Sequence, residues 1–182
     1  MNDTIQIIGG SLMGSGSIVA HVSASGIVDP TTGSAAGLAI TGNLSLAASA
    51  ELRFALGGTA QGTQYDFLSQ SGAVPLTLAG TLTLTFAGGF QGSVTGANTF
   101  AILSSNQPIL GAFANVANGA RLNTADGFGS FLVNYGAGSP FGAQNVELSA
   151  FVPVPEPGSL LLALAGGATL LLRRRPSAAR RS

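Results

Sequence analysis

The feature that most constrains the fold is an alternation of apolar with small or polar residues that runs from Ser17 to about Val152. A period of two places successive side chains on opposite faces of a β-strand. Glycine, asparagine and aspartate interrupt the alternation at short intervals, as they do at turns between short strands. The pattern predicts an all-β body with a closing strand in QNVELSAFVP, and a further short strand is expected at Ile5–Ile8.

A faint internal repeat refines this prediction. The segment ELRFALGG at 51–58 aligns with TLTLTFAGG at 81–89 after a shift of thirty positions. The same shift aligns TGNLSL at 41–46 with SGAVPL at 71–76, and SGIV at 25–28 resembles a third copy at closer spacing. Repeats of two or three strands with glycine at the corners favour a parallel β-solenoid, or β-helix, whose coils stack on one another. A β-sandwich is the alternative, in which the similarity reflects only repeated strands and turns.

Composition excludes several classes of function. Only 8% of the residues are charged, against about a quarter in typical soluble domains. Before Val152 the chain has two arginines, Arg53 and Arg121, against six acidic residues, so it offers no basic face and we expect no nucleic-acid partner. The chain has no cysteine, which excludes disulfides and thiolate metal sites.

Residues capable of catalysis or metal binding are few and scattered in the sequence. His21 is the only histidine and is predicted to be an exposed strand residue. Glu51 and Glu147 have no acidic neighbours at a useful spacing, and the thirty-residue shift places Glu51 opposite a threonine. Asp66 is expected to act as a hydrogen-bond acceptor at a turn or coil corner, and Asp126 to form an Asp-Gly turn. We therefore predict no catalytic residue, no metal site and no cofactor.

The C-terminal part of the chain divides into short segments with different properties. The body spans 1–151, a proline-rich linker 152–158, an apolar segment 159–172 and a basic tail 173–182. Counted from Gly158, the apolar segment gives about 22 Å of helix, which is short for a hydrocarbon core of about 30 Å. We predict a single short transmembrane helix, with the arginines holding the C-terminus in the cytoplasm.

The order of these parts resembles the PEP-CTERM sorting signal of exported proteins of Gram-negative bacteria. The matching residues are VPEPGS at 154–159, the apolar run, and Arg173, Arg174 and Arg175 as the membrane stop. The resemblance implies that an exosortase, a membrane-embedded enzyme similar to a cysteine protease, recognises Pro155, Glu156 and Pro157 and cuts nearby.

The body resembles the β-rich passengers common among such proteins and the helical passengers of autotransporters. The segments that carry this resemblance are Tyr65–Leu68, Gly80–Phe90 and Gly127–Phe151. They contain little chemistry, so they bear on the fold more than on an activity. Export would also need an N-terminal signal, which the sequence from Met1 does not display, and we expect the N-terminus to be incomplete.

Together these features predict an exported surface or extracellular-matrix protein that is not an enzyme. It would reside transiently in the inner membrane and then at the cell surface or outside the cell. Its expected partners are an exosortase, the membrane and, as a candidate, extracellular polysaccharide, in a role linked to exopolysaccharide or biofilm. The alternatives are a polysaccharide-active β-helix enzyme and a simple protein anchored in the inner membrane.

Overall fold

A computed structural model of the protein describes residues 3–31 and 35–154. In this part of the chain, strands in three sheets are joined by turns and by one short 3-10 helix, η1 (Phe90–Gly92), and there is no α-helix. The all-β prediction is therefore confirmed. The predicted transmembrane helix over 159–172 lies outside the described residues, as do the basic tail and most of the linker.

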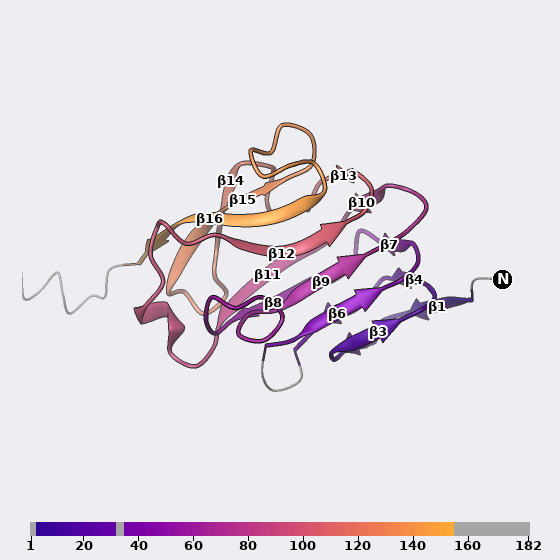
Figure 1. The fold of residues 1–182 in the computed structure, drawn as a ribbon, viewed down its shortest axis with the longest axis horizontal. Coiled ribbons are helices and arrows are strands. Elements are labelled where there is room, and N and C mark those ends of the chain that lie inside the picture. Colours follow the sequence, from indigo (N-terminus) through magenta and orange to yellow (C-terminus); the bar gives the residue numbers. More distant parts are fainter. Residues whose placement is uncertain (1–2, 32–34, 155–182) are drawn as a thin grey trace, which may run out of the picture.

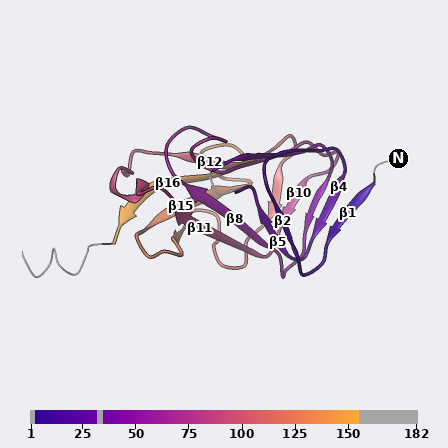
Figure 2. The same ribbon diagram turned by 90° about the horizontal axis from the view of Figure 1, so that it is seen from below.

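Two of the sheets are entirely parallel. Sheet A contains, in spatial order, β1 (Thr4–Ile7), β4 (His21–Ala24), β7 (Leu44–Leu46), β10 (Leu76–Leu78) and β13 (Ile109–Gly111). Sheet B contains β2 (Ser11–Met13), β5 (Ile27–Asp29), β8 (Glu51–Leu56) and β11 (Thr81–Phe86). Figure 2 shows strands of both sheets.

The third sheet is mixed. Sheet C begins with the parallel strands β3 (Gly16–Ile18), β6 (Gly37–Ile40), β9 (Phe67–Gln70) and β12 (Phe100–Ser105), which lie side by side in Figure 1. It continues through the antiparallel strands β16 (Asn145–Pro153), β15 (Gly129–Tyr135) and β14 (Ala120–Asn123). The sheet is thus parallel where the chain repeats and antiparallel where it closes.

The chain visits sheets A, B and C in the same order four times before β13, so each visit forms one three-sided coil. Corresponding strands of successive coils pair in parallel. This is the arrangement of a stacked solenoid, whereas sandwiches are made of antiparallel sheets. The last strand, β16, runs to Pro153, two residues past the predicted end of the body, because Val152 and Pro153 still pair with β15.

The predicted alternation separates the core from the surface. Leu52 and Leu84 are fully buried, while Arg53 between two buried neighbours is exposed. The residues predicted from the alternation to face the core are all buried or partly buried: Ile18, Ala20, Val22, Leu38, Ile40, Leu44, Leu46, Leu52, Phe54, Leu56, Leu82, Leu84, Phe86, Phe131, Val133 and Tyr135. Burial of these side chains is the main force that holds the coils together.

The predicted shift of thirty residues is correct for β8 and β11 in sheet B and wrong for β7 and β10 in sheet A. β8 and β11 pair with the predicted shift of thirty, from Glu51 opposite Thr81 to Leu56 opposite Phe86. In sheet A, Ser45 pairs with Thr77, a shift of thirty-two, because the corner over residues 47–50 is two residues longer than the corner over 79–80. SGIV at 25–28 is not a copy of TGNLSL, since it enters β5 of sheet B.

The shorter corner depends on a glycine. Gly80 has a φ of 70°, a left-handed conformation that other residues rarely adopt. A Cβ atom at this position would lie 2.1 Å from the carbonyl oxygen of Ala50 in the preceding coil. Gly80 therefore permits both the turn and the close stacking of two coils.

The far end of the solenoid is closed by aromatic side chains and by polar caps. Ring centroids among five phenylalanines lie 4.9–6.3 Å apart: Phe86, Phe90, Phe100, Phe131 and Phe151. The outer edge of β11 is capped at Leu82. The side-chain amide of Asn115 accepts from the Leu82 N–H at 3.0 Å and donates to the Leu82 carbonyl at 2.8 Å. Such caps prevent an edge strand from pairing with another chain.

Candidate functional site

The residues predicted to form the sorting signal cannot be placed in this fold. Pro155, Glu156 and Pro157 lie outside the described residues, and so do Arg173, Arg174 and Arg175. Within 3–31 and 35–154, no helix has the length and apolar character needed to cross a membrane. The geometry of the body is therefore the only source of a structural site.

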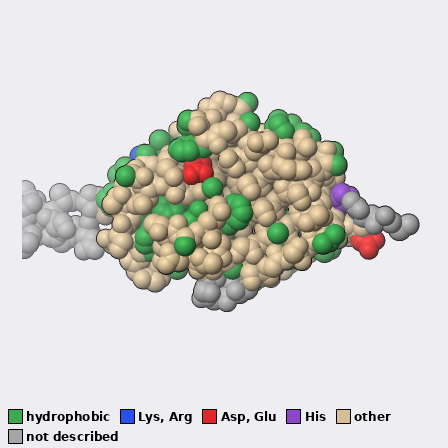
Figure 3. Space-filling model, in the orientation of Figure 1, with side chains coloured by type: hydrophobic (Ala, Val, Ile, Leu, Met, Phe, Trp, Pro, Cys, Tyr) green, Lys and Arg blue, Asp and Glu red, His purple; other side chains and the backbone are tan. Residues whose placement is uncertain are grey.

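Charged side chains are sparse on the face of the body shown in Figure 3. His21, predicted to be exposed, is half-buried at the start of β4, where its Nδ1 accepts a hydrogen bond from the Asn43 N–H at 2.8 Å. Asp126 lies in the predicted turn and accepts from the Phe86 N–H at 2.6 Å. Among the described residues, no three potential ligands gather at a point where they could hold a metal ion.

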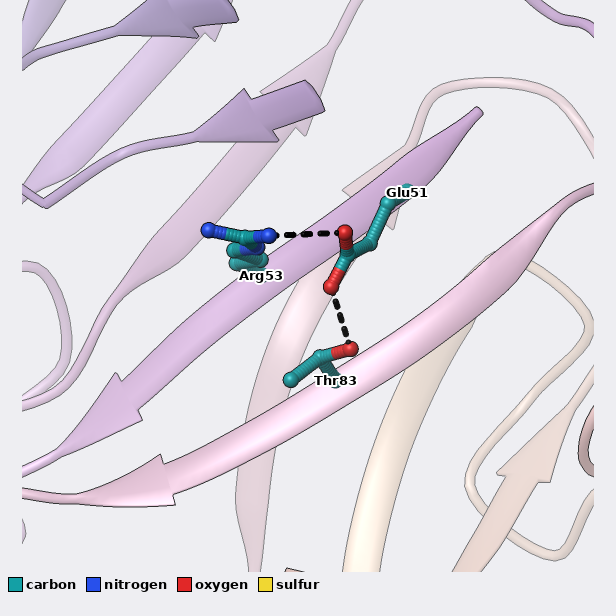
Figure 4. Close-up of polar contacts among 3 residues, drawn as sticks. All are labelled: Glu51, Arg53 and Thr83. Carbon is teal, nitrogen blue, oxygen red and sulfur yellow. Dashed lines mark hydrogen bonds and ion pairs between the residues drawn. The ribbon is translucent and has the colours of Figure 1, made fainter. Parts of the chain in front are cut away.

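The outer face of sheet B holds a connected polar group. Arg53 donates from Nη2 to Glu51 Oε2 at 2.9 Å, and the Thr83 hydroxyl donates to Glu51 Oε1 at 2.6 Å (Figure 4). The three side chains point outward because they alternate with core residues on β8 and β11. The hydrogen bond from Arg53, and then that from Thr83, lowers the pKa of the Glu51 carboxyl. Both carboxylate oxygens of Glu51 are thus engaged within the sheet.

A second polar group occupies the corner between sheets B and C. The fully buried Asp66 accepts hydrogen bonds from the Thr31 hydroxyl, the Ala36 N–H at 2.8 Å and the Ala55 N–H at 2.6 Å. Asp29, 9% exposed, accepts from the Thr31 N–H at 2.9 Å. Burial raises the pKa of the Asp66 carboxyl, although its hydrogen bonds act in the opposite direction. The prediction that Asp66 is a coil-corner acceptor is confirmed.

These two groups border one hollow of about 290 Å³ on sheet B. Its polar lining comes from Asp29, Arg53 and three threonines, Thr31, Thr83 and Thr85. Ala55 also lines it, and because Ala55 has only a methyl group between larger neighbours, the surface is depressed there. The hollow is the candidate functional site.

Sequence reasoning found some of these residues but not their grouping. It placed Glu51 opposite a threonine and Asp66 at a corner, and both positions are correct. It missed Asp29 and Arg53, which lie next to one another because Ile27 pairs with Glu51 two residues earlier on each strand. The period of two places both residues on the outer face of their strands, but predicting that they are neighbours also requires the register of β5 against β8.

Another buried acid lies on sheet C. Glu147 is 8% exposed and pairs across β12 and β16 with Ala101. Burial raises the pKa of its carboxyl, and burial together with the charge of Glu147 raises the pKa of Tyr65. Neither Glu147 nor Tyr65 lines the hollow on sheet B. No family model, no curated protein and no solved structure matches the chain.

Proposed function

We propose that the protein is exported and sorted to the cell surface or extracellular matrix through its C-terminal segment, which an exosortase processes. The observation that carries this proposal is the order of three parts at the C-terminus: the proline-flanked Glu156, an apolar run of marginal length, and Arg173–Arg175. Each part has a physical role that depends on the next, so their order is more informative than any one of them.

The three parts can act in sequence during export. Prolines at 153, 155 and 157 favour an extended backbone, which suits entry into a protease cleft. The apolar run is long enough to stop in a membrane with the help of arginine side chains that reach the interface. The arginines keep the C-terminus in the cytoplasm, so the motif and the body face the opposite side.

For the body we propose a structural or interaction role and not a catalytic one. Glycoside hydrolysis generally requires two carboxyl groups on either side of the scissile bond. Around the hollow on sheet B, Asp29 is the carboxylate of the lining, whereas Glu51 is bound by Arg53 and Thr83. Asp66 lies beneath the surface with three hydrogen-bond donors around it. This distribution supports binding more than acid–base catalysis.

Processing can be tested by expressing the full chain behind an export signal in a Gram-negative host with and without an exosortase. Fractionation and C-terminal mass analysis would follow the product. We expect the residues from near the motif to Ser182 to be lost only when the exosortase is present. The double variant Pro155→Ala, Glu156→Ala should prevent this loss.

A matched control is Pro176→Ala, which changes a proline outside the motif and should leave processing unchanged. If the mature protein keeps residues 160–182 in both hosts, the sorting proposal is wrong. Recovery of that product in the inner membrane would then support the alternative of a simple membrane-anchored protein.

A further inference from the structure

We propose that the hollow on sheet B binds one uncharged, hydroxyl-rich sugar unit of a polysaccharide. The inference rests on the proposed surface function for the source of the ligand, and on the geometry of the body for the chemistry of binding. The polar side chains around the hollow are Asp29, Thr31, Arg53, Thr83 and Thr85.

Several hydrogen-bonding atoms around the hollow remain available to a ligand. A threonine hydroxyl has one proton, and Thr83 gives its proton to Glu51 while Thr31 gives its proton to Asp66. The oxygen atoms of both threonines are therefore left as acceptors. Asp29 uses Oδ1 to accept from the Thr31 N–H, and its Oδ2 accepts from no described residue. The hollow consequently presents several acceptors, which match a ligand that has many O–H donors.

The charges around the hollow favour an uncharged ligand. Asp29 is nine-tenths buried yet lines the hollow, so its carboxylate has been partly desolvated before any ligand arrives. Arg53 is the cation of the lining, and it is already paired with Glu51 at 2.9 Å. The carboxylates of Asp29 and Glu51 outnumber the one guanidinium, and the Asp66 carboxyl lies beneath them, so the region has no excess of positive charge to attract an anion. A uronic acid, sulfate or phosphate would be repelled, whereas a neutral hydroxyl-rich sugar would not.

The size and shape of the hollow restrict the ligand further. A volume of about 290 Å³ is just below the range of ligand-binding hollows, which typically measure about 300–1,000 Å³. It suits a single ring better than a long oligosaccharide. The Ala55 methyl group and the Met13 side chain, which is 62% exposed, supply apolar surface for the C–H face of that ring.

The experiment is a titration of the ¹⁵N-labelled full chain, followed by NMR, in a zwitterionic detergent without a sugar headgroup. The probes are short gluco-oligosaccharides of the malto and cello series and, for comparison, oligogalacturonate. We expect the neutral probes to shift the amide signals of 53–55 and 83–85, with millimolar affinity. Oligogalacturonate should not shift them.

Two pairs of variants test the assignment. Ala55→Leu fills the hollow and should abolish binding, whereas Ala39→Leu, an outward position on β6 of sheet C, should not change it. Asp29→Asn should weaken binding at least about tenfold, because hydrogen bonds to charged groups contribute about 1.5–3 kcal/mol. The matched control for this change is Asp126→Asn, which lies outside the hollow.

Several results would overturn the inference. They are an absence of shifts with both neutral series at millimolar concentration, equal binding by Ala55→Leu and the wild type, or tighter binding of oligogalacturonate. If Ala55→Leu or Asp29→Asn fails to fold, its NMR spectrum will show this, and binding by the other variant then tests the inference. Because sugar binding is measured without an exosortase, its failure leaves the sorting proposal intact, and failed processing leaves the binding result intact.

Discussion

Replacement of Asp66 should destabilise the body more than replacement of any exposed acid. Its carboxylate is fully buried and accepts from two backbone N–H groups, those of Ala36 and Ala55, and from the Thr31 hydroxyl. Thr31 and Ala36 belong to one coil and Ala55 to the next. In Asp66→Ala all three lose their acceptor, and in Asp66→Asn one carboxylate oxygen is replaced by an amide group that can only donate.

The magnitude follows from the backbone donors. A buried donor without a partner costs about 1–3 kcal/mol, so two N–H groups amount to about 2–6 kcal/mol for Asp66→Ala. Burial raises the pKa of Asp66, which means that the wild type already loses some stability as its carboxyl ionises in the fold. We therefore expect a net loss of about 2–4 kcal/mol for Asp66→Ala and about 1–3 kcal/mol for Asp66→Asn.

Urea unfolding followed by far-ultraviolet circular dichroism measures this loss, since the chain has no tryptophan for fluorescence. For a chain of this length, 2–4 kcal/mol corresponds to a fall in Tm of about 4–16 °C. The control is Asp126→Asn, an exposed acceptor whose bonds water can replace, with an expected cost below about 1 kcal/mol. A loss below about 0.5 kcal/mol for Asp66→Ala would refute the reasoning, because no reorganisation of the corner should satisfy both N–H groups.

Two further predictions concern the cap and a buried carboxyl. Asn115→Ala removes both side-chain bonds to Leu82 on the edge of β11 and should cost about 1–3 kcal/mol in urea unfolding, whereas Asn98→Ala, in an exposed turn, should cost less. Glu147→Gln should stabilise the body more at about pH 7 than at about pH 4. The raised pKa of Glu147 makes its contribution to stability greatest below the unfolded value of 4.5 and smaller as pH rises through the folded value. Unfolding measured at both pH values tests the sign, and an advantage for Glu147→Gln that decreases with pH would contradict it.

The class of the fold and the inward-facing residues follow from the sequence because both depend on a local period. A strand with one buried face alternates whichever strand it pairs with, so Leu52, Phe54 and Leu56 identify their own face. The direction of pairing leaves no such mark. The closing strand expected in QNVELSAFVP is present as β16, but it runs antiparallel to β12 and its burial does not alternate, since Val146, Glu147 and Leu148 are all buried.

The candidate site could not be predicted for a related reason. Asp29, Arg53 and Thr83 come from three coils, and their proximity depends on the register between strands that are far apart in the sequence. A change of one residue in that register would send the side chains of β5 to the opposite face. Ala55 is no more informative, since a small residue marks a hollow only when its neighbours on the adjacent strands are larger.

The regular stacking of sheet C, despite corners of unequal length, can be explained by the two ends of β9. Asp66 precedes β9 and binds Ala36 of the coil before it, while Gln70 at its end donates to the Gly42 carbonyl at 2.9 Å and accepts from the Ser105 hydroxyl at 2.7 Å. β9 is therefore fixed at one end to the preceding coil and at the other to both adjacent coils. Buried polar groups of this kind favour one register, because any slip leaves them without partners. The loops 57–66 and 87–99 can then differ in length without disturbing the sheet, although the shift between paired residues is thirty from β6 to β9 (Leu38 opposite Leu68) and thirty-five from β9 to β12 (Leu68 opposite Leu103).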